Sequence, residues 1–398
     1  MQKRVLKNGL TVLYDKRDSN SVTVNIWVKT GSDNEDIKFL GLSHFLEHIL
    51  FEGTKTRSAQ QIANAIEKVG GYMNAATSND FTCYYVTVPS KYFEVALDIL
   101  SDMLICSSFN QKVIDKERKV ILDEISLGHD DPNKYQWILF QENLFKKINA
   151  KNPTAGTVRS VSGLTRENII NYFNEYYVPN NIAISISGKA NNVFNNVSKF
   201  FGKLKRKQLP KIKKIKEPAD KKITKVKEKR RLTSSYLIIG YKAPPLNHKD
   251  SFAMDVIRAI LGKGQSSRLF HEIRTERGLG YVVGAEYDAR KDYGLFAAFV
   301  SAAKKNIQIC REIILNEFKL HGLTQKEVKE AKDYIIGSAL IKNEDNGTRA
   351  ENNAALEMSN LDLKTYLKGI KNVTILDVKR ILKKYLNGNY TEALLEQK

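Results

Sequence analysis

The most informative stretch of the sequence reads His44-Phe45-Leu46-Glu47-His48 and continues with Ile49-Leu50-Phe51. If this stretch is helical, about 3.6 residues per turn place His44 and His48 on one face, with Glu47 beside them. Two imidazoles at that spacing can both bind one Zn²⁺ ion. The apolar neighbours indicate a buried setting, in which unpaired histidines are costly. For the short motif alone, a surface cluster without a metal is the alternative interpretation.

A second segment offers a further metal ligand. A catalytic zinc site usually has three protein ligands and an open position. Glu117, Ile121 and Glu124 share one face of a helix predicted over 115–127, because their spacing is i, i+4, i+7. A carboxylate on such an apolar stripe is costly to bury unless it binds a metal or a cation. We predict Glu124 as the third ligand and Glu117 as the acceptor that orients a ligand imidazole.

The composition is that of a globular protein. Hydrophobic residues make up 42% and charged residues 27% of the 398 positions, which excludes wholesale disorder and fibrous repeats. Three widely spaced cysteines exclude a disulfide framework and favour a reducing compartment. No apolar run approaches the ~18 residues of a membrane span, and the N-terminus shows no secretory signal. We therefore expect a cytoplasmic protein that does not associate with membranes.

The net charge of +20 is concentrated in one segment. Residues 203–231 contain 15 Lys and Arg but only three Asp and Glu, together with Pro210 and Pro218. Their few apolar residues are isolated, which is typical of a solvated connector. A nucleic-acid-binding arm is the alternative. Aromatic side chains that stack on bases are absent from the segment, so nucleic acid is not expected as a partner.

Both sides of this connector show an α+β pattern. Alternating apolar residues predict a strand over 22–28, and a periodic segment predicts a helix that begins at Ser58. We predict an N-terminal domain over 1–205, a Lys-rich linker over 206–231 and a C-terminal domain over 232–398.

The two halves also resemble each other. Three separated blocks of sequence align at near-constant offsets of 209, 210 and 214 residues, which suggests two copies of one fold. The second copy has lost every predicted metal-site side chain, so we expect one metal ion per chain. The residues at the corresponding positions are Met254, Ile257, Arg258, Ala331 and Ser338.

Taken together, these motifs resemble the pitrilysin and insulinase superfamily of zinc metallopeptidases, especially its short-chain branch similar to mitochondrial processing peptidase. His-x-x-Glu-His is the inverted zincin order. The similarity extends over nearly the whole chain. It includes Asn8-Gly9-Leu10, the segment from Gly71 to Thr77, the helix from Glu117-Arg118 to Glu124, and the segment from Leu269 to Tyr281.

The resemblance implies a role for each metal-site position. His44, His48 and Glu124 would bind one zinc ion, and Glu47 would be the general base. Glu117 would support the zinc site by holding a ligand imidazole.

The resemblance also implies substrate-binding residues. Asn74, Ala75 and Thr77 would lie on an exposed strand edge to which a peptide substrate adds as a further strand. Arg274 and Tyr281 would stabilise the scissile carbonyl. For this pair, a loop salt bridge and a packed aromatic residue are the structural alternative.

Members of this superfamily enclose their substrate between two bowl-shaped halves. The resemblance implies two homologous α/β-sandwich domains, each a sheet packed by helices on one side, that form one half of a peptidase clamshell. We therefore expect a homodimer, with Arg274 and Tyr281 acting in the partner's zinc site. The expected function is a zinc-dependent endopeptidase for peptides or small unfolded polypeptides. A presequence-processing peptidase and a non-catalytic assembly subunit are the alternatives, and the intact metal-site residues argue against the latter.

Overall fold

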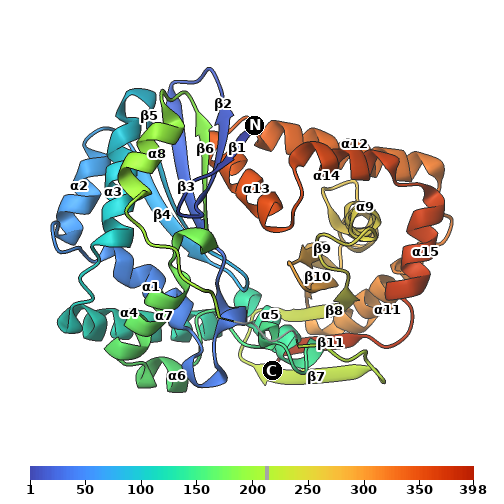
Figure 1. Cartoon of the computed structure of the whole chain (residues 1–398). Coiled ribbons are helices and arrows are strands. Elements are labelled where there is room, and N and C mark those ends of the chain that lie inside the picture. The colour runs from blue at the N-terminus through green and yellow to red at the C-terminus, as the bar shows by residue number, and fades with distance from the viewer. Residues whose placement is uncertain (211–214) are drawn as a thin grey trace. The chain divides into compact units, whose positions relative to one another are not determined.

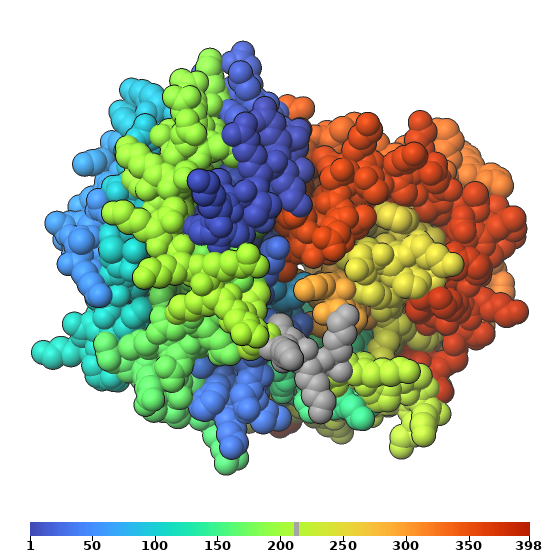
Figure 2. All heavy atoms as spheres, in the orientation of Figure 1, coloured from blue at the N-terminus to red at the C-terminus, as the bar shows by residue number. Residues whose placement is uncertain are grey.

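The computed structural model of the chain describes residues 1–210 and 215–398, and Figure 2 shows the remaining four residues in grey. The chain divides into two units, each assembled from three separate segments. Unit 1 contains Met1–Ser126, Asn152–Lys214 and Lys342–Met358, and unit 2 contains Leu127–Lys151, Ile215–Ile341 and Ser359–Lys398. Among the described residues, no helix is long and apolar enough to cross a membrane.

Unit 1 is built on a six-stranded sheet in the order β1-β2-β6-β3-β5-β4. Its strands are β1 (Gln2–Val5), β2 (Thr11–Lys16), β3 (Ser21–Val28), β4 (Tyr72–Thr77), β5 (Thr82–Pro89) and β6 (Ile182–Gly188). β2 and β6 pair in parallel, and the other neighbouring strands pair antiparallel. The central strands β3 and β6 are almost entirely buried, which confirms the predicted strand over 22–28 and leaves β4 at one edge.

One face of this sheet packs against helices from the N-terminal part of the chain (Figure 1). The helices of this part that lie wholly or mostly in unit 1 are α1 (Leu42–Phe51), α2 (Ala59–Glu67), α3 (Phe93–Ile105), α4 (Gln111–Asp130), α6 (Val158–Gly163), α7 (Arg166–Tyr176) and α8 (Val193–Phe201). The apolar alternation of β3 supplies Val24 and Ile26 to their common core, where Phe45 of α1 and Ile121 of α4 also lie.

The opposite face of the sheet is covered by α13 (Asn346–Met358), which comes from the C-terminal part of the chain (Figure 1). Trp27, Cys83 and Ala183 point to this face and pack against Ala354. Arg349 of α13 also forms an ion pair with a carboxylate of β2 at 2.5 Å. The resemblance implied helices on one side of the sheet only, so this second covering is an addition to the expected fold.

Unit 2 repeats the plan with a five-stranded sheet in the order β7-β11-β8-β10-β9. Its strands are β7 (Thr224–Arg230), β8 (Ser235–Ala243), β9 (Gly280–Ala289), β10 (Gly294–Ala302) and β11 (Thr391–Gln397). Its main core lies under helices from the C-terminal half, namely α9 (Ser251–Gly262), α10 (Arg268–Phe270), α11 (Ile307–Glu317), α12 (Gln325–Lys342), α14 (Leu363–Asn372) and α15 (Ile375–Tyr385). The other face packs against α5 (Pro132–Leu144), a helix from the N-terminal half. The predicted α+β class with two helix-packed sheets is therefore confirmed.

β7 corrects part of the solvated connector predicted over 206–231. Residues 211–214 of that segment lie outside the described residues. Thr224–Arg230 pairs in parallel with β11, and its exposed lysines alternate with half-buried residues. Lysines on an edge strand discourage pairing with another chain. Backbone pairing with β11 rather than an apolar face defines this strand, so its polar sequence has the same pattern as a solvated connector.

Candidate active site

The predicted motif forms α1, and its two histidines project from one face of that helix. Their imidazole centroids lie 4.8 Å apart. The other face of α1 is buried in the core through Phe45, Leu46 and Ile49. The same apolar periodicity that makes this segment an amphipathic helix therefore directs both histidines away from the core.

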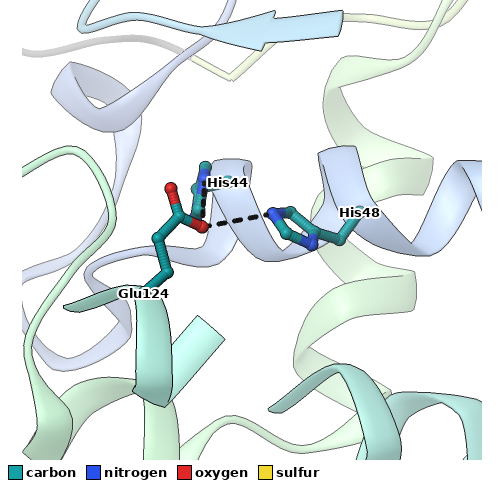
Figure 3. A group of neighbouring side chains, drawn as sticks. All are labelled: His44, His48 and Glu124. Atoms are coloured by element: carbon teal, nitrogen blue, oxygen red, sulfur yellow. Dashed lines mark ion pairs between the residues drawn. The ribbon is translucent and has the colours of Figure 1, made fainter. Parts of the chain in front are cut away.

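Glu124 of α4 lies opposite these histidines. Figure 3 shows one of its carboxylate oxygens between the two rings, 3.6 Å from Nε2 of His44 and 3.6 Å from Nε2 of His48. Buried isoleucines on α4, among them Ile121, hold the helix against the core. In the part of the chain that the structure describes, no other set of His, Cys, Asp and Glu side chains forms a comparable group.

The donor set fits a zinc ion. The two nitrogen–oxygen separations of 3.6 Å are too long for hydrogen bonds. They are close to the distance of about 3.4 Å between two ligand atoms that each lie about 2.0–2.1 Å from a tetrahedral zinc ion. Two imidazoles and one carboxylate are a known ligand set of catalytic zinc, which keeps one position open. His44, His48 and Glu124 would hold such an ion.

Glu117 supports the orientation of His48. Its side chain is buried, and its Oε2 lies 3.2 Å from Nδ1 of His48. A carboxylate at this distance favours a proton on Nδ1 and leaves Nε2 free to bind a metal. Glu117 also contacts Lys116 through its other oxygen, at 3.3 Å.

The two histidines have opposite pKa shifts. Burial, and then the charge of His48, lower the pKa of His44 to about 4. Burial also lowers the pKa of His48, but the carboxylates of Glu124 and Glu117 outweigh it, and the net pKa is raised. Because a ligand imidazole must be neutral, His44 is already in its binding form at neutral pH.

Glu47 lies at the same surface of α1. Burial raises its pKa, although a hydrogen bond from the Thr77 hydroxyl opposes the shift. A carboxyl group with a raised pKa is suited to act as a general base near neutral pH. Thr77, which the sequence assigned to substrate binding, thus holds the carboxylate of the predicted base.

β4 presents an open edge beside this group. Among residues 1–210 and 215–398 it pairs with β5 alone, and Asn74 and Ala75 lie in its middle. A cavity of about 420 Å³ extends from Glu47 and His48 along β4 and the ends of α1 and α2. The residues that line this cavity also include Glu67 of α2, Tyr72 and Met73. The edge and the cavity together offer space for an extended peptide.

Arg274 and Tyr281 come together in unit 2. Nη1 of Arg274 donates to the backbone oxygen of Tyr281 at 3.1 Å, and its guanidinium lies 4.4 Å from the Tyr281 ring centroid. The Tyr281 side chain is 73% exposed, so the alternative of a packed aromatic residue does not hold. Tyr281 is therefore accessible to a ligand, and the half-buried Arg274 lies directly beside it.

The second copy of the motif carries an ion-pair cluster in place of metal ligands. Met254 and Ile257 of α9 are buried apolar residues. Arg258 pairs with Asp255 at 2.7 Å and with Glu286 of β9 at 3.1 Å. These residues satisfy each other's charges and offer no imidazole to a metal.

A His-x-x-Glu-His helix that faces a distant glutamate defines a site of the inverted zincin type. Residues 10–158 match the family model of insulinase (peptidase family M16), and residues 163–335 match the model of the peptidase M16 inactive domain. The chain therefore belongs to the insulinase family, peptidase family M16. The branch similar to mitochondrial processing peptidase stays a prediction.

Curated relatives support this assignment. A protein of Bacillus subtilis (strain 168), named uncharacterized zinc protease YmxG, is 30% identical, and the match covers 88% of this chain and 87% of the relative. The uncharacterized zinc protease SCO5738 of Streptomyces coelicolor is 32% identical, with 87% of this chain and 78% of the relative covered. A protease from Helicobacter pylori has the same fold, with a TM-score of 0.94, 24% identity and 99% of both chains covered.

Proposed function

We propose that the protein is a zinc-dependent endopeptidase that hydrolyses peptides or small unfolded polypeptides. The convergence of His44, His48 and Glu124, with Glu47 beside them, carries this proposal. The family and the relatives named zinc proteases support it. A catalytically silent assembly subunit would have no need of this complete set of side chains.

Glu47 and Thr77 have different roles in the proposed hydrolysis. When bound, zinc supplies Lewis acidity toward a water molecule and the peptide carbonyl. Glu47 takes the proton of the attacking water at its carboxylate and can pass it to the leaving amine. The Thr77 hydroxyl keeps that carboxylate in place.

Substrate binding would use the open edge of β4. A peptide that adds to this edge gains main-chain hydrogen bonds with little demand on its sequence. The Tyr281 hydroxyl and the Arg274 charge would stabilise the developing oxyanion. This arrangement favours extended, unfolded substrates, because a folded chain has no free strand to offer.

Replacement of Glu47 tests the catalytic role. Glu47→Gln should keep one equivalent of zinc per chain but reduce peptide hydrolysis by about 10²–10⁴-fold, since the proton acceptor is lost. Zinc content and cleavage of a mixed peptide library measure the two effects. Glu67→Gln makes the same change elsewhere in the cavity and should leave the proton-transfer step intact. Near-normal hydrolysis by Glu47→Gln would exclude Glu47 as the base.

We also propose that the enzyme is a homodimer in which Arg274 and Tyr281 act in the partner's zinc site. The support is indirect, because the chain holds two repeats and the superfamily uses four to enclose a substrate. Mixing Glu47→Gln chains with Arg274→Ala chains should restore part of the activity through heterodimers. Mixing Glu47→Gln with Glu124→Ala is the control, since one chain then lacks the base and the other lacks a metal ligand, so neither zinc site is complete. No recovery after verified subunit exchange would refute the arrangement.

A cytoplasmic location is part of the proposal. Cys83, Cys106 and Cys310 are all free thiols, which is the state expected in a reducing compartment.

A further inference from the structure

We propose that Glu35 and Tyr172 are positioning residues that fix the first turn of α1 and thereby the directions of its two histidines. This inference rests on the proposed zinc-peptidase function and concerns residues that are not themselves metal ligands.

Glu35 caps α1 from outside the helix. Its side chain is 6% exposed, and its two carboxylate oxygens accept hydrogen bonds from the backbone N–H groups of Gly41 at 2.7 Å and Ser43 at 2.6 Å. The first four N–H groups of a helix have no partner within it. Gly41 is the N-cap of α1 and has no side chain to satisfy them. Glu35 therefore replaces the missing cap with a buried acceptor.

Tyr172 of α7 contacts the same turn through the side chain of Ser43. Its hydroxyl lies 2.8 Å from Oγ of Ser43 and 2.8 Å from Oγ1 of Thr30, in a buried setting. Ser43 is thus fixed at its backbone by Glu35 and at its side chain by Tyr172. His44 is the next residue of the chain.

The two anchors determine how α1 is rotated about its axis. Successive helical residues point about 100° apart, so fixing Ser43 sets the direction of His44 and, one turn later, that of His48. A helix without a cap frays from its first turn, and His44 lies in that turn. The contacts therefore preorganise the metal site, which lowers the cost of ordering it when zinc binds.

Zinc affinity tests this role on the full-length chain. Glu35→Gln leaves one acceptor oxygen and places an NH₂ group against a backbone N–H, while Tyr172→Phe removes only the hydroxyl. Each should raise the zinc Kd, measured by competition with a chromophoric chelator, by about 10-fold or more. Each should also change the visible absorption of the Co²⁺-substituted protein, which reports coordination geometry. Tyr176→Phe is the matched control, because its buried ring lies next to Tyr172 in α7, while its hydroxyl forms no hydrogen bond with α1 among the described residues.

The outcomes separate positioning from mere stabilisation. Variants that unfold at a lower temperature but keep the zinc Kd and the Co²⁺ spectrum of the parent would overturn the inference. If Glu35→Gln does not fold, Tyr172→Phe decides alone, and an unchanged Kd in that variant overturns it. A parent chain that binds no zinc would refute the proposed function as well, whereas a zinc-binding parent with unaffected variants would refute only the positioning role.

Discussion

Glu117→Gln is the most direct test of how the metal site is supported. The substitution keeps the size of a buried side chain but removes its charge, 3.2 Å from Nδ1 of His48. A hydrogen bond to a charged group contributes about 1.5–3 kcal/mol. That range corresponds to a loss of about 10–100-fold in zinc affinity, the usual effect of losing such a supporting contact. We expect the ligands to stay in place and the zinc Kd to rise by this factor.

The assay is chelator competition at neutral pH with the purified chain. Glu52→Gln is the matched control, because Glu52 contacts the same Lys116 at 2.9 Å but, within the described part of the chain, forms no ion pair with a histidine. The control should keep the parental Kd. An unchanged Kd for Glu117→Gln, or an equal loss in both variants, would show that the contact with His48 does not support metal binding.

Two further predictions concern stability. Burial raises the pKa of Asp250, but ion pairs with two basic residues of α15 outweigh burial and lower this pKa from 3.8 to about 2. The charged carboxylate therefore contributes about 2 kcal/mol to the free energy of unfolding at pH 7. This contribution is complete above the unfolded pKa and is lost as the pH falls through about 2. In urea unfolding, Asp250→Asn should therefore be less stable than the parent at pH 7 and nearly equal to it toward pH 2. Asp333→Asn, at an exposed position, is the control. A stability difference for Asp250→Asn that does not change with pH would contradict the argument. Ile121→Ala leaves a cavity at a fully buried position of α4 and should lower the free energy of unfolding by about 2–5 kcal/mol in the same assay. Val120→Ala, at a position that is 44% exposed, should lower it by less than about 0.5 kcal/mol. Equal losses of stability in the two variants would argue against a tightly packed α4.

Local periodicity predicted the parts of the fold and the site that depend on neighbours in sequence. The spacing of His44 and His48 defines a face of α1, and the spacing of Glu117 and Glu124 defines a face of α4. Burial of the apolar face of α1 leaves both histidines on its other face, whereas on α4 the two glutamates share a face with buried Ile121. The strands with clear apolar alternation, such as β3, were predictable for the same reason.

Contacts that depend on distant segments could not be predicted in this way. The Thr77 contact with Glu47 depends on where β4 lies relative to α1, and the capping of α1 by Glu35 follows no short motif. β7 has a polar sequence because an edge strand needs little apolar surface. The sheet against which α5 or α13 packs could not be predicted either, because periodicity shows that a segment is helical but not which sheet it contacts.

The position of α13 has a consequence for how the protein is made. The helices α1 and α4, which carry the peptidase motif, leave the ribosome well before α13, the helix that covers the other face of their sheet. Until α13 has been synthesised, Trp27 and its apolar neighbours are exposed to solvent and to other chains. A shortened gene product that ends before residue 342 would carry every metal-binding side chain and still lack the segment that finishes unit 1. Any attempt to express the first half alone should therefore supply residues 342–358 as well.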